Sequence, residues 1–287
     1  MAPGAPGVTY SIVARDAETG ELGVAVQSRA FGTGAGVPWA EPGVGAVATQ
    51  SSTDRGYGVL GLQLMRAGKT PEQALAGLVA ADADPEVRQV AILAADGAVA
   101  AHTGARCILE AGHYVGEGYS VQANMMRSAD VWPAMADAFE ASTGTLARRL
   151  LTALDAAEAA GGDWRGQQAG GILVVPAKGA PWGRVSNLRV DDHERPLEEL
   201  RRLLALEEGY RAVNREDRRA EAARNAGLAE IDVRWAEILD AAHAGKLEQA
   251  RELLAPLFAA EPRWADYVRA LADAGELPHA DELFPEE

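Results

Sequence analysis

The sequence is poor in cysteine and in basic residues. Cys107 is the only cysteine among 287 residues, so no internal disulfide can form and we expect a reducing, cytoplasmic environment. Lys and Arg number 27 against 42 Asp and Glu, which gives a net charge of −15, and no basic block is present that could follow a phosphate backbone. We therefore expect no nucleic-acid partner. No apolar run approaches the roughly 18 residues of a membrane-spanning helix, so we expect no membrane partner.

Familiar catalytic motifs are also missing. The sequence has no G-x-S-x-G, no H-E-x-x-H and no phosphate loop ending in Gly-Lys-Ser/Thr. The histidines are scattered without metal-ligand spacing, and "GTGAG" at 32–36 follows a hairpin and opens no clear helix. We therefore expect neither a metal nor an organic cofactor. Cys107 is interpreted as a small buried residue, and a thiol nucleophile flanked by His102 and His113 is the alternative.

The pattern of the sequence changes near residues 193–207. Before this boundary, short apolar strands alternate with glycine-rich turns and helical stretches, and the pattern predicts a hairpin from Tyr10–Arg15 and Leu22–Ser28. Strands and helices come in blocks, which favours antiparallel sheets layered with paired helices. The predicted division is a leader or mistaken start at 1–8, a main domain at 9–204 and a helical extension at 205–287.

Two further patterns predict local structure. Thr70 followed by Pro71 and Glu72 predicts the start of a helix, and Asp96-Gly97 predicts a hairpin turn. In the extension, "AGKLEQARELL" and "AGELPHADELF" repeat at a 30-residue offset, which indicates stacked helical hairpins that loosely resemble tetratricopeptide repeats. Residues 206–287 hold ten basic and 19 acidic residues, a net charge of −9, typical of a solvated helical cap.

Four stretches carry a specific resemblance. "TYSIVARDAETGELGVAVQSR", "VPWAEPGVGAVATQ", "GYSVQANMM" and "NLRVDDHERP" resemble the family of domains of unknown function numbered 1028, over residues 8–204. That family is placed among folds like those of the N-terminal-nucleophile (Ntn) hydrolases, which include proteasome-type subunits. The resemblance implies an α+β protein, a four-layer αββα sandwich, here with a small all-α C-terminal extension. The extension is similar to one labelled as peptidoglycan-binding in some relatives.

The mechanism implied by this resemblance centres on Thr9. An N-terminal threonine carries its own general base, because its α-amino group has a pKa of about 7.7 to 8.0 and lies near its own hydroxyl. We predict Thr9, Arg29 and Asn124 as catalytic residues, with Asn124 and backbone N–H groups near Gln50 and Ser51 as oxyanion donors. The predicted substrate-binding residues are Ser28, Gln50, Ser51, Asp54, Tyr57 and Asp191.

Two departures from the proteasome-like pattern are visible. Gln27 stands before Ser28 where those proteins place an acidic residue, and no lysine occurs before Lys69. The second departure is that Thr9 is not the first residue. Val8 stands where relatives carry an initiator methionine, and a GTG start codon read as valine would explain the upstream residues. The alternative is a real tail at 1–8, with Thr9 an ordinary strand threonine.

Three functions follow from these observations. The first is an amidohydrolase of the Ntn type that cleaves a small amide or related C–N bond, acting on a small-molecule substrate as a homodimer. The second is a non-catalytic fold of the same architecture that binds a metabolite or protein partner and uses the helical extension for interaction. The third makes the extension a cell-wall-binding module, which the absence of a secretion signal disfavours.

Overall fold

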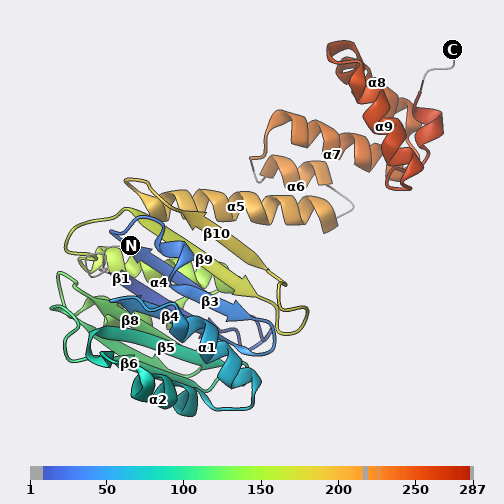
Figure 1. Ribbon diagram of the computed structural model, residues 1–287. Coiled ribbons are helices and arrows are strands. Elements are labelled where there is room, and N and C mark those ends of the chain that lie inside the picture. The colour runs from blue at the N-terminus through green and yellow to red at the C-terminus, as the bar shows by residue number, and fades with distance from the viewer. Residues whose placement is uncertain (1–8, 216–218, 226, 285–287) are drawn as a thin grey trace. The chain divides into compact units, whose positions relative to one another are not determined.

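The computed structural model describes residues 9–215, 219–225 and 227–284 (Figure 1). Residues 1–8, on which the expected leader falls, lie outside the described residues. The chain divides between Leu204 and Ala205 into two compact units, and each unit is described by itself.

Ten strands of the first unit form two antiparallel sheets. The larger sheet has the order β10-β9-β2-β1-β8-β7, and the smaller has the order β3-β4-β5-β6. The larger sheet contains β1 (Thr9–Arg15), β2 (Leu22–Ser28), β7 (Gly112–Gly116), β8 (Tyr119–Asn124), β9 (Ala169–Val175) and β10 (Ser186–Val190). The smaller sheet contains β3 (Pro38–Glu41), β4 (Gly45–Ser51), β5 (Arg88–Ala94) and β6 (Val99–Thr103).

Side chains of β1 alternate between two apolar layers, as the period of a strand requires. Tyr10 and Ile12 lie in a buried cluster with residues of α3 (Val131–Ala141) and α4 (Leu146–Ala159). Val13 points to the opposite face and packs with buried residues of the smaller sheet. The two sheets therefore share a core, and the helices cover the outer face of the larger one.

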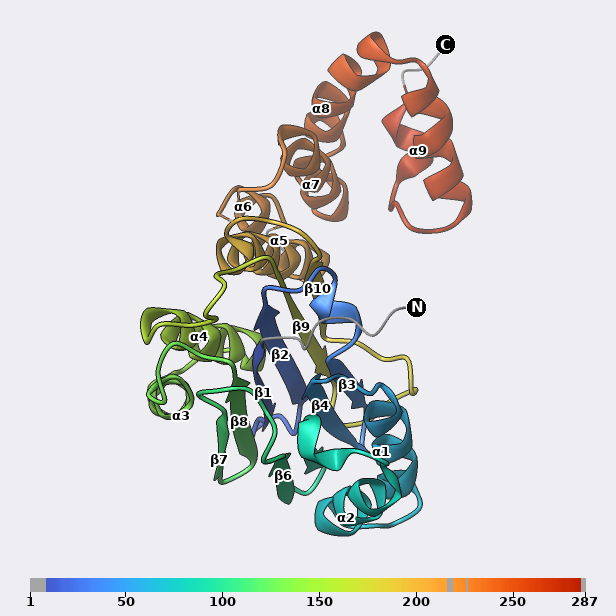
Figure 2. The ribbon, with the colours of Figure 1, turned by 60° about the vertical axis from the view of Figure 1, so that its left-hand side comes forward.

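The smaller sheet has its own covering helices. Its outer face packs against α1 (Gly56–Arg66) and α2 (Pro71–Ala81) through a third apolar cluster. Figure 2 shows the two sheets between the two helix pairs. The layer order is helices, sheet, sheet, helices, which confirms the predicted α+β sandwich. Short 3₁₀ helices occupy Thr33–Ala35 and Pro85–Val87.

Local sequence signals explain several of these elements. The first hairpin is confirmed, with Thr9 opposite Ser28, and the Asp96-Gly97 turn joins β5 to β6. Thr70 begins α2 with a capping box: its side chain accepts the backbone N–H of Gln73, and the Gln73 side chain accepts that of Thr70. The pattern predicts neither β3 nor β7. The first is short and begins with a proline, and the second is a solvent-exposed edge strand with little apolar alternation.

Helices alone form the regular structure described in the second unit, which confirms the all-α extension. The division between units falls inside α5 (Pro196–Arg215). The helices that follow are α6 (Arg219–Asn225), α7 (Glu230–His243), α8 (Leu247–Ala260) and α9 (Arg263–Asp273), with a 3₁₀ turn at Ala280–Leu283. Ile238, Leu254 and Val268 form the centre of an apolar cluster that joins α7, α8 and α9.

Candidate functional site

The strand register brings several predicted site residues to one edge of the sheets. Thr9 pairs with Ser28 on one side and with Asn124 on the other. On the smaller sheet, Ser51 and Arg88 are paired at the corresponding ends of β4 and β5. The carbonyl of Thr9 bonds to a side chain of β4, so these ends of the two sheets lie together.

Side chains of neighbouring strands form hydrogen bonds with the hydroxyl and with the carbonyl oxygen of Thr9. Its hydroxyl donates a hydrogen bond to Ser28 Oγ at 3.1 Å. Its carbonyl oxygen accepts from Gln50 Nε2 at 3.2 Å and from Asn124 Nδ2 at 3.3 Å. Thr9 is only 3% exposed. Side chains from three other strands thus fix the position of this residue at the head of β1.

The side chains that hold Thr9 belong to a buried amide network. Gln89 Oε1 accepts from Gln50 Nε2 at 2.7 Å and from Asn124 Nδ2 at 2.9 Å. Gln89 Nε2 in turn donates to the Ala123 carbonyl at 2.8 Å. The network joins β1, β4, β5 and β8 across the interface between the sheets. Both N–H groups of the Asn124 amide are used in it, so this geometry gives Asn124 a part in positioning Thr9.

A second part of the amide network lies two residues further along β1, at Ser11. Ser11 donates to Gln50 Oε1 at 2.6 Å and accepts from Gln122 Nε2 at 2.6 Å. Gln122 Oε1 accepts from Ser120 Oγ at 3.0 Å. The sequence reasoning missed Gln89 and Gln122. Each amide takes part in the network through contacts with residues far away in the chain, which no local pattern marks.

Two strained residues stand beside this network. Ser51 ends β4 with φ of 67°, and Met125 follows β8 with φ of 59°. A residue other than glycine costs about 1 kcal/mol or more in this left-handed region. Such backbone strain often marks functional sites. Ser51 is buried and hydrogen-bonds to the thiol of Cys107, which itself donates to the Arg88 carbonyl at 3.3 Å. Burial raises the pKa of Cys107, which argues against a thiolate nucleophile.

Arg29 and Asp163 meet where β2 ends. The backbone N–H of Arg29 donates to Asp163 Oδ2 at 2.8 Å, and its guanidinium donates to the Gln167 carbonyl at 2.8 Å. Asp163 is 1% exposed, and burial raises its pKa despite the N–H groups of Arg165 and Arg29 that its carboxylate accepts. The sequence reasoning missed Asp163. Only a contact between residues far apart in the chain brings it here.

One buried side chain nearby lacks polar partners. Both amide atoms of Gln27 are buried, and neither has a hydrogen-bond partner among the described residues. Gln27 pairs with Tyr10 on the helix-covered face of the sheet, opposite in direction to Ser28. The Gln27 side chain therefore points away from the face on which Ser28 binds Thr9.

Backbone hydrogen bonds join the loops that surround the head of β1, where Thr9 lies. Met125 N donates to the Ile108 carbonyl at 3.0 Å, and Trp164 N donates to the Met125 carbonyl at 3.3 Å. Four large apolar side chains of these loops and the one after β2 are exposed: Phe31 by 75%, Ile108 by 40%, Leu109 by 82% and Trp164 by 66%. We call these four residues the apolar rim. Exposed apolar side chains gathered around one feature are a common sign of ligand contact.

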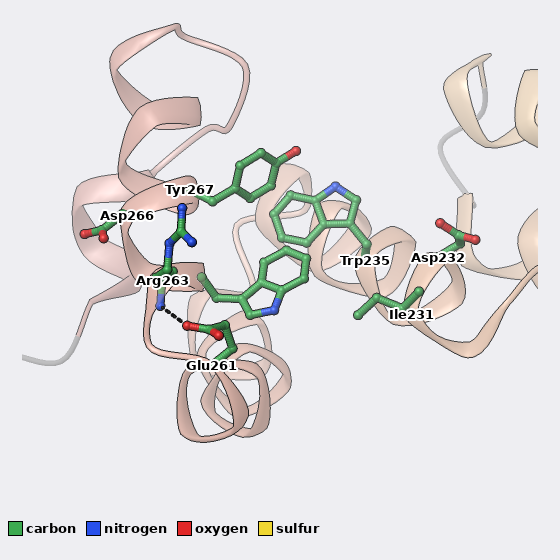
Figure 3. A pocket seen from close by; sticks show the side chains of 8 residues that line it. Ile231, Asp232, Trp235, Glu261, Arg263, Asp266 and Tyr267 are labelled. Carbon is green, nitrogen blue, oxygen red and sulfur yellow. Dashed lines mark hydrogen bonds between the residues drawn. The ribbon is translucent and has the colours of Figure 1, made fainter.

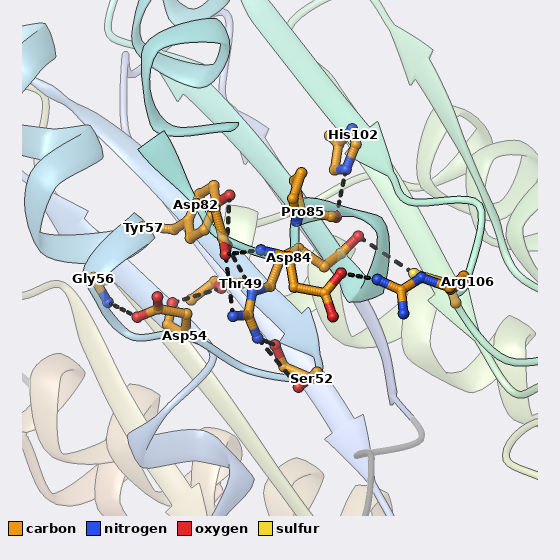
Figure 4. A network of polar contacts seen from close by, with 12 residues as sticks. Thr49, Ser52, Asp54, Gly56, Tyr57, Asp82, Asp84, Pro85, His102 and Arg106 are labelled. Carbon is orange, nitrogen blue, oxygen red and sulfur yellow. Dashed lines mark hydrogen bonds and ion pairs between the residues drawn. The ribbon is translucent and has the colours of Figure 1, made fainter. Parts of the chain in front are cut away.

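Asp54 and Tyr57 have structural contacts close to the same edge. Asp54 Oδ1 accepts the backbone N–H of Gly56 at 2.7 Å where α1 begins. Tyr57 donates its hydroxyl to Asp82 Oδ2 at 3.0 Å, which also accepts from Arg88 Nε at 2.8 Å (Figure 4). Arg88 Nη1 donates to the Ser52 carbonyl at 2.6 Å. This network fixes the loop that follows β4.

The Asp82–Arg88 pair allows a stability prediction. The hydrogen bond from Arg88 lowers the pKa of Asp82, and the two side chains are 6% and 17% exposed. Asp82→Asn leaves Arg88 without its charge partner, so we expect a loss of about 3 kcal/mol in the free energy of unfolding at pH 7. Because the folded pKa is lowered, the carboxylate stabilises the fold above its unfolded pKa of about 3.9, and this contribution is lost as pH falls through the folded value.

Urea unfolding at pH 7 and at pH 3 measures this effect. The difference between wild type and Asp82→Asn should shrink at the lower pH. Asp84→Asn is the control, because Asp84 pairs with the exposed Arg106 and should contribute less than about 1 kcal/mol. Equal losses in the two variants would contradict this account of the network.

Asp191 lies at the same end of the larger sheet, after β10. Its carboxylate accepts from Arg189 Nη2 at 2.9 and 2.8 Å, and its carbonyl accepts the N–H of Gly32 at 3.0 Å. These contacts tie the end of β10 to the loop that follows β2. No hydrogen bond joins Asp191 to Thr9 among the described residues.

Residues 9–215, 219–225 and 227–284 hold no group of three or more His, Cys, Asp or Glu arranged to bind a metal ion. Within those ranges, no helix combines the length and apolar character needed to cross a membrane.

The fold and the strand-end site define an α+β sandwich with a buried threonine at the head of its central strand pair. A family model described as a family of unknown function, DUF1028, matches residues 9–200. The crystal structure of protein SPO2555 from Silicibacter pomeroyi, of the same family, is similar at 31% identity and a TM-score of 0.64. The match covers 75% of this chain and 90% of that one. The chain belongs to the DUF1028 family, and no curated protein matches it.

Proposed function

We propose that the first unit is an Ntn-type amidohydrolase that cleaves a small amide or related C–N bond with Thr9. The supporting observation is the arrangement of Thr9. Its hydroxyl meets Ser28, while Gln50 and Asn124 hold its carbonyl. These contacts hold the Thr9 hydroxyl and backbone in one position, which a nucleophile at this place requires. The family match also begins at this residue.

The reaction needs a free α-amino group on Thr9. The neutral amine accepts the hydroxyl proton as Oγ1 attacks the amide carbon, and the C–O bond forms. The C–N bond then breaks, and the leaving nitrogen takes the proton. Water hydrolyses the resulting ester, which frees the acid and restores Thr9. This sequence is complete without a metal or organic cofactor.

The surrounding residues take positioning parts in this proposal. Ser28 orients the hydroxyl, and Gln50 and Asn124 hold the Thr9 backbone. Since both N–H groups of Asn124 are used, backbone N–H groups near Gln50 and Ser51 are the better candidates for oxyanion stabilisation. Arg29 has an indirect part, because the hydrogen bond from its guanidinium to the Gln167 carbonyl fixes the loop at that residue. We assign no direct role in the chemistry to Asp54 or Tyr57, whose polar contacts support the loop after β4.

The apolar rim indicates the kind of amide. Phe31, Ile108, Leu109 and Trp164 are exposed on loops around the Thr9 end, where a bound substrate would contact them. Burying one such side chain against a ligand contributes about 1.5 to 3 kcal/mol at most. The proposed substrate is therefore a small amide that carries an apolar group.

A β-lactone probe tests this proposal without knowledge of the substrate, because it acylates an activated hydroxyl. Chain that begins at Thr9 should gain one probe mass, and peptide mapping should place the adduct on Thr9. Labelling of another residue, or none, would overturn the proposal and favour a non-catalytic binding fold.

We also propose that the protein is a cytoplasmic homodimer. In the larger sheet β7 is an edge strand, and its Tyr114 and Val115 are 47% and 42% exposed. An exposed apolar edge strand can pair with the same edge of a second copy.

Light scattering should give about twice the chain mass of 30.1 kDa. Val115→Lys should shift the protein to monomer, because it places charges opposite each other at the shared edge. Val59→Lys, at a similarly exposed site on α1, is the control and should leave the dimer intact. A monomer in the wild type would refute the dimer.

A further inference from the structure

The second unit contains a cavity of about 720 Å³ lined by aromatic side chains (Figure 3). Trp235 comes from α7, and Trp264 and Tyr267 come from α9. The ring centroids of Trp235 lie 5.9 Å from Trp264 and 5.7 Å from Tyr267, and the latter two are 5.6 Å apart. We call the cavity with these three rings the aromatic pocket. Its volume is in the range of ordinary ligand sites.

The rings only partly serve the apolar core of this unit. Trp235 and Trp264 are half-buried against the cluster of α7, α8 and α9. Tyr267 is 49% exposed, and Ile231, which also lines the pocket, is 43% exposed. Apolar surface therefore remains available to a ligand at the mouth of the pocket.

The polar groups at the pocket are mainly acidic. Asp232, Glu261 and Asp266 line it together with one basic residue, Arg263. Asp232 accepts from the Tyr210 hydroxyl at 2.7 Å, and Asp266 lies 3.4 Å from Arg269. Glu261 accepts the backbone N–H of Arg263 at 3.2 Å. Three carboxylates against one guanidinium leave the lining negative, in a unit whose residues 206–287 carry a net charge of −9.

We propose that the aromatic pocket binds the cationic side chain of a partner peptide, lysine or arginine, together with an adjoining apolar residue. Aromatic faces attract cations, and the surrounding carboxylates strengthen that attraction. The same charges oppose an anionic ligand. A neutral sugar could stack on the tryptophans, but the net negative charge of the lining would not contribute to its binding. Ile231 and the exposed part of Tyr267 would contact the apolar residue.

Calorimetry on the full chain tests the choice of ligand. The probe is a tetrapeptide of alternating leucine and lysine with blocked ends, compared with its leucine–glutamate counterpart and with the trimer of N-acetylglucosamine. We expect binding of the lysine peptide alone, weakened several-fold between 50 and 300 mM salt. Binding of the glutamate peptide or the sugar with equal or higher affinity, or no binding of the lysine peptide, would overturn the proposal.

Substitutions locate the binding. Glu261→Gln should weaken it about threefold, whereas Glu252→Gln, an exposed carboxylate of α8 outside the pocket, should leave it unchanged. Tyr267→Leu should weaken it about fivefold and Tyr267→Phe should not, because phenylalanine keeps the aromatic face. Circular dichroism verifies the helices of each variant. Equal affinities across all four variants would place the peptide elsewhere and contradict the assignment.

Discussion

Replacing Thr9 by alanine should abolish labelling by the β-lactone probe and lower amide hydrolysis by a factor on the order of 10³ or more. The change removes the oxygen that forms the covalent bond to the substrate. It should cost only about 1 kcal/mol of stability, since the hydroxyl makes one hydrogen bond, to Ser28. Intact-mass spectrometry measures the labelling, and circular dichroism verifies the fold.

Two further variants complete this test. Thr9→Ser keeps the hydroxyl and the amine, so it should retain part of the labelling and activity. Thr53→Ala removes an exposed threonine from the loop after β4 and should behave as wild type. Labelling that persists in Thr9→Ala would place the nucleophile at another residue.

Adding a single alanine in front of Thr9 should lower activity about 10²- to 10⁴-fold, because the amine then belongs to another residue and Thr9 loses its general base. The hydroxyl and its contacts with Ser28 stay in place, so the variant separates the base from the nucleophile. A chain produced in the same way but beginning at Thr9 is the control.

The pH dependence provides a second measurement of the same base. In the chain beginning at Thr9, activity should fall as pH drops below about 7.7, because the protonated amine cannot accept the hydroxyl proton. Equal activity with and without the added alanine would contradict the amine mechanism, whatever the nucleophile.

The layered core of the fold was predictable because its signals are local. The hairpin at the start of the chain alternates two buried faces, and Thr70 with Pro71 specifies the start of α2. The strand β7 was not predictable in this way, since its exposed residues carry no apolar alternation. Its place in the sheet depends on pairing with β8.

Part of the candidate site could likewise be predicted from local sequence signals, and part could not. Thr9, Ser28, Gln50 and Asn124 stand out in the sequence as polar residues at the ends of apolar strands, and the structure brings them into contact. Gln89 and Asp163 reach the site only through contacts between distant segments, which no local pattern encodes. The aromatic pocket was missed for the same reason: Trp235 and Trp264 lie on different helices and meet only in the folded unit.

The mass of the protein made from its natural gene tests the central claim most directly. If Thr9 is the nucleophile and its own amine the base, the mature chain must begin at Thr9 and lack residues 1–8 of the printed sequence. Intact-mass spectrometry, with sequencing of the first residues, should find this shorter chain in the fraction that reacts with the β-lactone probe. Full reactivity in a chain that still carries Met1 to Val8 would contradict the account.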